Sequence, residues 1–186
     1  DTGVLKTADG RSVTITETVK HRQSGEHNHV PADGAPVLTS GETVSAEIDW
    51  QRRHRHMRMH TCLHLLCAVV TGGVTGGSIG EAKGRLDFDM PEKTVDKAEL
   101  TEKLNGLIAE DHAVVTGWIT ENELDGNPDL IRTMSVKPPS GAGRVRTIRI
   151  GAPKGAPVDY QPCGGTHVAR TAEIGAVEVR KIESKG

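Results

Sequence analysis

One segment near the middle of the chain carries histidines at a spacing that suits a shared metal ion. Residues 54–67 read HRHMRMHTCLHLLC. His60 and His64 are four positions apart, so their rings project from one face of a helix and can bind the same ion. His56 and His60 have the same spacing. The pattern therefore indicates a metal-binding face and leaves open which of the two pairs would be used.

A second pair of candidate ligands lies about a hundred residues later. In the segment QPCGGTH, Cys163 and His167 are separated by Gly164, Gly165 and Thr166. We expect the glycines to let the chain turn tightly, so that the two ligands converge. They also leave backbone N–H groups able to meet an anionic or carbonyl oxygen. The segment thus combines two ligands with donors of the kind that stabilise a reacting carbonyl.

The two pairs together would make a tetrahedral zinc site with one thiolate and three imidazole donors. Its members are His60, His64, Cys163 and His167. Since 99 positions separate the pairs (163 − 64), the site would join distant parts of the fold, unlike a short zinc finger. The alternative is a buried cysteine beside an unrelated loop histidine. The presence of both pairs favours the metal.

The helix that must position the histidines has recognisable ends. Asp49 is a candidate N-cap for a helix from Trp50 to about Val70, and Gly72 and Gly73 would end it. An apolar stripe at helical spacing gives this helix a buried face. The stripe consists of Leu63, Leu66, Cys67 and Val70.

Patterns of alternating and helical hydrophobicity predict the other elements. Strands are expected at residues 12–20, 43–48, 83–89, 112–120, 144–150 and 174–182. A second helix is expected at 95–110 and a short, broken one at 121–133, whereas 21–36 and 71–80 read as a loop and a Gly-rich connection. Strands and helices do not alternate regularly, and no Rossmann or P-loop fingerprint occurs. We therefore predict an α+β fold, with a mostly antiparallel sheet packed against the long zinc-bearing helix. Residues 1–48 would form a partial N-terminal β-rich subdomain and residues 49–186 the domain with the zinc site.

Composition restricts the class of protein further. The 186 residues include 35% hydrophobic and 26% charged side chains, and the formal net charge is −2. No apolar run is long enough to span a membrane, so we expect no membrane partner. Aromatic residues make up only 2%, which argues against a module that stacks nucleic-acid bases on several rings. Three cysteines cannot pair completely, as is typical of a reducing compartment such as the cytoplasm.

The two motifs and their separation resemble those of a known family. HTCLHLL followed by CGGTHV is similar to the HxxxH and CxxxH signatures of the alanyl-tRNA synthetase editing domain, above all in its freestanding AlaX-type relatives. The segment IGEAKGRLDFD at 79–89 resembles the RxDF segment of that family, and the opening DTGVL resembles the stretch that follows its Gly-rich loop. The resemblance extends from Asp1 to Ile182.

The resemblance implies a zinc-dependent editing domain over residues 49–186. Its four zinc ligands would be His60, His64, Cys163 and His167. It would hydrolyse the ester at the acceptor end of mischarged tRNA(Ala) without a nucleotide cofactor or ATP. Seryl-tRNA(Ala) is the implied main substrate and glycyl-tRNA(Ala) a second one. The implied cleft is lined by Thr61 and by the turn of Gly164, Gly165 and Thr166, which we take as the catalytic candidates.

The sequence departs from the family pattern in two places. Cys62 stands where a small alanine is common, so its thiol is a packing residue or a target of oxidation. The Gly-rich loop that helps to form the family's substrate pocket is not found in this sequence.

Other classes of metal protein also carry closely spaced histidine pairs. S-ribosylhomocysteine lyase also combines a helical histidine pair with a distant cysteine, but places a glutamate where this chain has Leu63. A zincin protease needs glutamate directly after the first histidine, where Thr61 stands. A structural zinc module that only binds RNA, the editing domain of a full alanyl-tRNA synthetase and a threonyl-type relative stay open.

Several further residues are candidates for secondary roles. Four arginines with His54 and His56 could form a basic face for tRNA phosphates; the arginines are Arg52, Arg53, Arg55 and Arg58. A second basic edge, or equally the solvated side of a strand, would consist of Arg144, Arg146, Arg149 and Lys154. We expect Cys67 to be a core residue, and His27 and His29 to be exposed in a loop. Asp87 and Asp89 could orient a ligand or simply end a strand.

Overall fold

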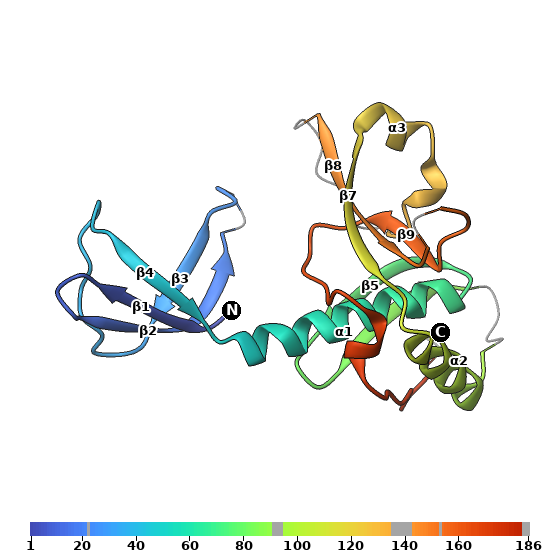
Figure 1. Cartoon of the computed structure of the whole chain (residues 1–186), viewed down its shortest axis with the longest axis horizontal. Coiled ribbons are helices and arrows are strands. Elements are labelled where there is room, and N and C mark those ends of the chain that lie inside the picture. Colours follow the sequence, from blue (N-terminus) through green and yellow to red (C-terminus); the bar gives the residue numbers. More distant parts are fainter. Residues whose placement is uncertain (22, 91–94, 135–142, 153, 184–186) are drawn as a thin grey trace. The chain divides into compact units, whose positions relative to one another are not determined.

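The computed structural model describes residues 1–21, 23–90, 95–134, 143–152 and 154–183 (Figure 1). The chain divides into two compact units, Asp1–His54 and Arg55–Gly186. The predicted division between residues 48 and 49 stays a prediction. Within the described residues, no helix is both long and apolar enough to cross a membrane.

The first unit is an antiparallel sheet of four strands in the order β3-β2-β1-β4. The strands are β1 (Gly3–Thr7), β2 (Ser12–Lys20), β3 (His27–Pro31) and β4 (Val44–Ile48). Alternation along β2 buries Val13 and Ile15, as expected of a strand with one covered face. The strands predicted at 12–20 and 43–48 are confirmed.

The expectation of a loop throughout residues 21–36 was wrong. Within that range β3 pairs with β2 from Lys20↔His27 to Ile15↔Pro31. All five residues of β3 are exposed, including His27 and His29. An edge strand needs only backbone hydrogen bonds to its neighbour, so a polar sequence can form one without an apolar face.

Helix α1 (Trp50–Val69) carries the histidines and begins where the sequence predicted. The carboxylate of Asp49 accepts a hydrogen bond from the backbone N–H of Arg52 at 2.9 Å, which caps the first turn. Along the second half of the helix, residues 61–65 and Cys67 are buried. Buried Leu65, which lies outside the predicted stripe, is fully enclosed and belongs to the core.

The second unit contains a three-stranded antiparallel sheet in the order β7-β8-β9. Its strands are β7 (Val114–Thr120), β8 (Arg144–Ile150) and β9 (Asp159–Pro162), the last of which the sequence reading missed. A hairpin of β5 (Gly73–Ile79) and β6 (Gly84–Asp89), helix α2 (Lys97–Ala109), the short α3 (Glu121–Asp125) and the 3-10 turns η1 (Pro128–Leu130) and η2 (Thr171–Ile174) complete the unit.

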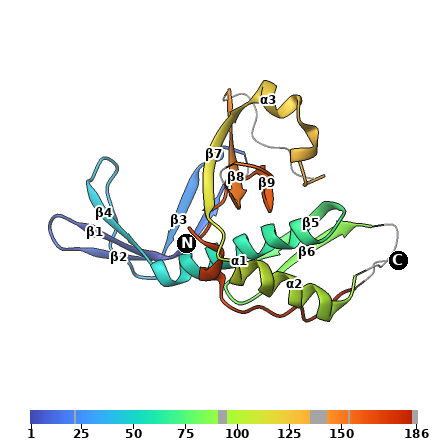
Figure 2. The same cartoon turned by 45° about the vertical axis from the view of Figure 1, so that its right-hand side comes forward.

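The core of this unit lies between the sheet and the two longer helices (Figure 2). It joins Leu65 of α1, Leu104 of α2 and Ile148 of β8, all within one apolar cluster. The predicted α+β class with antiparallel strands is therefore confirmed, and so is the long helix.

Two local predictions in this unit were wrong. The Gly-rich stretch 71–80 contains strand β5, because the hairpin with β6 supplies the backbone partners that the weak propensity of glycine does not reveal. Residues 174–182 begin in η2 and then form no strand. The backbone of Val177 instead bonds the side chain of Asn105 in α2, with its N–H donating to Oδ1 at 3.0 Å and its C=O accepting from Nδ2 at 2.9 Å.

Candidate metal centre

Two histidines of α1 meet the cysteine and histidine that follow β9. One ligand atom from each of His60, His64, Cys163 and His167 lies within 4.8 Å of the other three. Sγ of Cys163 is 3.5 Å from Nε2 of His60 and 3.3 Å from Nε2 of His167. The tertiary structure thus brings together two pairs that are about a hundred residues apart in the sequence.

The same geometry distinguishes between the two histidine pairs of the helix. The spacing allowed either His56 with His60 or His60 with His64. The ring centroids of His60 and His64 are 5.2 Å apart, and those of His64 and His167 are 4.6 Å apart. His56 is not a member of this cluster.

The turn that carries Cys163 is held by Arg146 of β8. Nη1 of Arg146 donates to the carbonyl oxygens of Cys163 at 2.8 Å and Gly165 at 2.6 Å, while Nη2 donates to Oγ1 of Thr116 at 3.1 Å. The backbone N–H of Cys163 also donates to the carbonyl of Arg146 at 3.0 Å. An arginine predicted as part of a basic edge therefore ties the turn to the sheet.

The two glycines of the turn differ in what surrounds them. A Cβ on Gly165 would lie 2.2 Å from Cε1 of His60, whereas a Cβ on Gly164 would meet nothing within 4 Å. Neither glycine has a positive φ angle. Gly165 is thus needed for the close approach of a ring, and the turn brings Cys163 and His167 together without a left-handed glycine at either position.

The hydroxyl of Thr61 lies behind His167 and is fully buried. It donates to the carbonyl of Met57 at 3.0 Å, accepts from the N–H of Val168 at 3.3 Å and lies 3.1 Å from Nδ1 of His167. With its proton used on Met57, this oxygen accepts from Nδ1–H of His167, which leaves Nε2 facing the cluster.

Asp159 plays the corresponding part for His64, and sequence reasoning missed it. Oδ2 of Asp159 lies 2.8 Å from Nδ1 of His64, and both side chains are buried. Nε2 of Gln161 donates to both oxygens of the same carboxylate. A carboxylate behind a histidine fixes the ring and its tautomer, as is common in metal sites. The sequence signal that could have identified Asp159 is the pair of polar residues Asp159 and Gln161, which are two positions apart and shortly precede Cys163.

The charges of the cluster depend on one another. Burial acts to raise the pKa of Cys163, but its interactions with the His167, His60 and His64 rings outweigh burial and lower the pKa to about 3. Burial acts to lower the pKa of His64, but its bonds with Asp159 and Cys163 raise it to about 9. Burial lowers the pKa of His167 to about 4. The thiolate is thus compensated by an imidazolium, whose place a divalent cation would take as His64 releases its proton.

These residues fit a metal ion. Three ring nitrogens and one thiolate face a common point, and two of the rings are oriented by Asp159 and Thr61 from behind. A set of one sulfur and three nitrogen donors suits zinc in tetrahedral coordination. Gly164 and Thr166 lie exposed on the turn beside the cluster, so a ligand from solvent can reach this side.

The arginines of the predicted basic face make contacts within the protein. Nε of Arg53 donates to Asp1 at 2.9 Å, that of Arg55 to Glu81 at 2.8 Å, and that of Arg58 to the carbonyl of Ile174 at 2.8 Å. Similarly, Arg149 donates to the carbonyl oxygens of Ala152 and Gly155. Much of the local positive charge therefore serves to attach loops and termini.

The remaining candidates lie outside the cluster. Burial raises the pKa of Cys62 and of Cys67 to about 11, as suits packing residues, and none of the three cysteines forms a disulfide. The carboxylate of Asp87 pairs with Arg85 at 3.2 Å on β6, and Asp89 ends the same strand.

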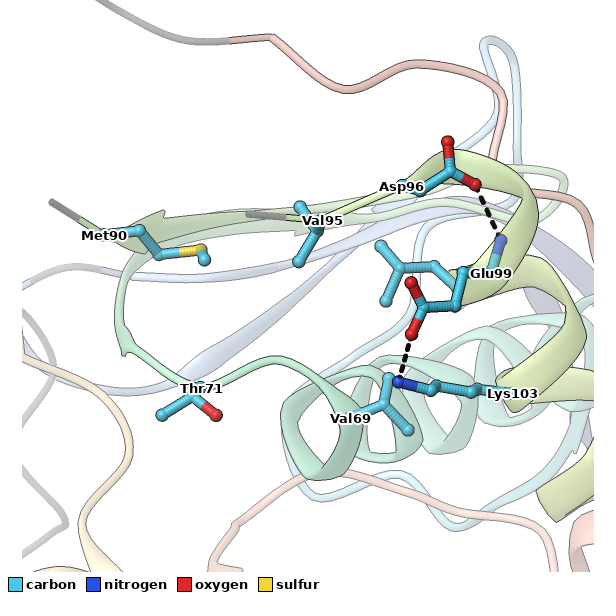
Figure 3. Close-up of a pocket in the computed structure, with 8 residues that line it drawn as sticks. Val69, Thr71, Met90, Val95, Asp96, Glu99 and Lys103 are labelled. Carbon is cyan, nitrogen blue, oxygen red and sulfur yellow. Dashed lines mark hydrogen bonds and ion pairs between the residues drawn. The ribbon is translucent and has the colours of Figure 1, made fainter. Parts of the chain in front are cut away.

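A pocket elsewhere in this unit shares no residue with the cluster (Figure 3). It lies between the end of α1 and the start of α2, where Glu99 and Lys103 form an ion pair at 2.6 Å. Asp96 at its edge accepts the hydrogen bonds that cap α2. Its charged groups are thus engaged in stabilising the helix.

Comparison with known proteins finds relatives in the family that the two sequence motifs resemble, and these relatives match nearly the whole chain. The family model described as the threonyl and alanyl tRNA synthetase second additional domain matches residues 145–186. The chain is 31% identical over 194 residues to the alanyl-tRNA editing protein AlaX-M of Methanosarcina acetivorans, with 100% of this chain and 77% of that protein covered. The AlaX-M protein of Saccharolobus solfataricus is 32% identical over 190 residues, with the same coverage. An alanine–tRNA ligase of Pyrobaculum calidifontis is 31% identical over 192 residues, which cover 98% of this chain and 20% of the ligase.

Proposed function

Because this chain belongs to the AlaX family of alanyl-tRNA editing proteins, we propose that it hydrolyses the ester of mischarged tRNA(Ala). The observation that carries the proposal is the convergence of four ligand atoms within 4.8 Å beside an exposed turn. The reaction would take place at the acceptor end of the tRNA, in the cytoplasm, and would consume no nucleotide.

We assign a zinc ion to His60, His64, Cys163 and His167. Four protein ligands argue against a permanently bound hydroxide, so zinc bound there would anchor the substrate or, on loss of one protein ligand as the substrate enters, polarise the ester carbonyl or acidify a water. Asp159 and Thr61 are positioning residues, because their oxygens hold the rings of His64 and His167 from the side away from the cluster. Because the hydrogen bonds of the Thr61 hydroxyl are used inside the protein, we assign it this positioning role and no contact with the substrate.

The exposed turn is the part of the site that would meet the substrate. The N–H of Gly165 donates to Sγ of Cys163 at 3.4 Å, so it stabilises the thiolate. We assign the stabilisation of the developing oxyanion to the N–H groups of the exposed residues Gly164 and Thr166.

The proposed substrates are seryl-tRNA(Ala) and, second, glycyl-tRNA(Ala). A small apolar amino-acid pocket in a synthetase cannot strongly reject an added hydroxyl, so a second site must remove the error by hydrolysis. The same reaction is expected if these residues work as an editing domain within a longer synthetase, and the match to alanine–tRNA ligases allows for that arrangement.

The decisive experiment is hydrolysis of seryl-tRNA(Ala) by protein whose zinc content has been measured, with alanyl-tRNA(Ala) as the control. We expect rapid loss of serine while alanine is spared. Persistence of seryl-tRNA(Ala) in the presence of stoichiometric zinc would contradict the proposal and favour a structural zinc module that only binds RNA.

The choice of ligands has its own test. Cys163→Ala and His64→Ala should each lower the zinc content and abolish deacylation, whereas His56→Ala should keep one zinc per chain. Metal analysis by mass spectrometry after dialysis measures this. Equal loss of zinc in the His56 and His64 variants would show that the other histidine pair binds the metal.

A further inference from the structure

Trp118 exposes a large aromatic surface on strand β7. Its exposed fraction is 56%, whereas Ile119 beside it is half-buried and Leu124 just beyond is buried. Exposing an indole forgoes a substantial apolar contribution to stability. An exposed indole is a candidate binding surface, and its position relative to the candidate metal centre indicates what it could bind.

The register of the sheet puts Trp118 on the same face as residues of the metal centre. Trp118 pairs with Arg146, and Ile148 pairs with both Thr116 and Gln161. Because side chains alternate along a strand and paired residues share a face, one side of the sheet is defined. This face carries Thr116, Trp118, Arg146, Ile148, Asp159 and Gln161. At its β9 end lies the carboxylate that holds His64, and at its β7 edge lies the exposed indole.

Arg146 connects the two ends of this face. Its guanidinium bonds Thr116, two positions from Trp118, and the carbonyl oxygens of Cys163 and Gly165 in the turn. The residue one step further along the same face, Arg144, is exposed and pairs in register with Thr120. An aromatic surface flanked by a cation thus lies on the same face of the sheet, next to the β8 residue that holds the turn carrying a ligand.

We propose that Trp118 is a stacking surface for the nucleobase of the 3′-terminal nucleotide of the tRNA, with Arg144 facing its phosphate. The proposal rests on the proposed function. The ester and the terminal base are attached to the same ribose, so a surface that binds the base must adjoin the reactive site. Stacking on one indole suits any base, and a nearby guanidinium matches the phosphate charge. One exposed ring in this place is enough, even though the chain as a whole is poor in aromatic residues.

Fluorescence tests the contact without any hydrolysis. The chain has two tryptophans, so Trp50→Phe leaves Trp118 as the sole indole emitter. We expect saturable quenching when an uncharged acceptor minihelix ending in CCA is added. The same minihelix without CCA should quench little, and Trp118→Phe protein, which retains Trp50, should respond to neither. Binding of the minihelix by anisotropy without quenching of Trp118, or no binding at all, would overturn the proposal.

Kinetics provide a second readout. Trp118→Ala should raise KM for seryl-minihelix about tenfold and change kcat by less than about twofold, because a stacking contact contributes chiefly to binding. Trp118→Phe should recover most of the affinity. Trp50→Ala is the matched control, since Trp50 is 57% exposed in the other unit. An unchanged KM in Trp118→Ala would reject the stacking surface while leaving the deacylase intact. Quenching without deacylation by the wild type would reject the proposed function alone.

Discussion

Gly165 differs from its neighbour Gly164 because the ring of His60 lies against Gly165 alone. A side chain at Gly165 would have to occupy the space of Cε1 and Nδ1 of His60, at 2.2 and 2.5 Å. Such separations are far below any van der Waals contact, so either the turn or the ring must move. The pair of glycines is therefore a sensitive probe of the geometry of the cluster.

We predict that Gly165→Ala reduces the zinc content and weakens zinc affinity at least tenfold, because a displaced His60 ring no longer reaches the common point. Gly164→Ala should retain one zinc per chain. Metal analysis and competition with a chromogenic chelator measure both variants. If Gly164→Ala lost zinc as readily, a general sensitivity of the turn, and not the contact with His60, would be responsible.

The three cysteines should react very differently, because their pKa values differ. At pH 6 the thiol of Cys163, with a pKa of about 3, is ionised, whereas Cys62 and Cys67, with pKa values of about 11, remain protonated. Since the thiolate is the nucleophile, brief treatment of zinc-depleted protein with iodoacetamide should modify Cys163 alone. Peptide mass spectrometry identifies the site, and added zinc should protect it. Modification of Cys62 first would show that the proposed charge distribution is wrong.

At the scale of elements, helix α2 holds a segment that forms no strand. Asn105 bonds both backbone groups of Val177, and Oγ1 of Thr101 accepts from the N–H of Val179 at 3.0 Å. Val177 and Val179 also pack against the core. Side chains of a helix thus supply the hydrogen bonds that an adjacent strand would otherwise provide.

Asn105→Ala should destabilise the protein by about 1–3 kcal/mol, because the backbone groups of Val177 are left without partners in a partly buried place. Urea unfolding followed by circular dichroism measures the change. The exposed Asn122 in α3 offers a control, and Asn122→Ala should change the free energy of unfolding by less than about 0.5 kcal/mol. Equal stability of the two variants would mean that solvent replaces the bonds to Val177.

At the scale of the whole molecule, all four candidate ligands belong to the second unit. They come from α1 and from the turn after β9. These two segments are about a hundred positions apart in the sequence. A metal that binds the folded state alone stabilises it, and the effect should be greatest in the segments that the ion joins.

Removal of zinc should therefore lower Tm and speed hydrogen exchange in residues 57–68 and 159–168. Strands β1, β2 and β4 of the first unit should exchange at unchanged rates. Hydrogen-exchange mass spectrometry with and without a chelator measures this, and Cys163→Ala protein should be indifferent to the chelator. A uniform increase over both units would contradict a role confined to the second.

The sequence by itself determined the features that depend on neighbouring residues. The start of α1, the strands at 12–20 and 144–150 and the α+β class follow from capping and periodicity, which act over a few positions. Both pairs of candidate ligands were found in the same way, as local spacings of four. Strand β3 and strand β5 escaped this reading because pairing, and not composition, makes them strands.

Only the tertiary structure decided which groups surround the cluster. It placed Asp159 and Thr61 behind two of the rings and brought His60 against Gly165, and it put His64, not His56, in the cluster, as the family resemblance had implied. It also showed that Arg146, a candidate for a basic edge, supports the turn through hydrogen bonds to two of its carbonyl oxygens. Each of these contacts joins segments about 20 to 110 positions apart. Their approach is set by packing of the common core, which no local pattern in the sequence encodes.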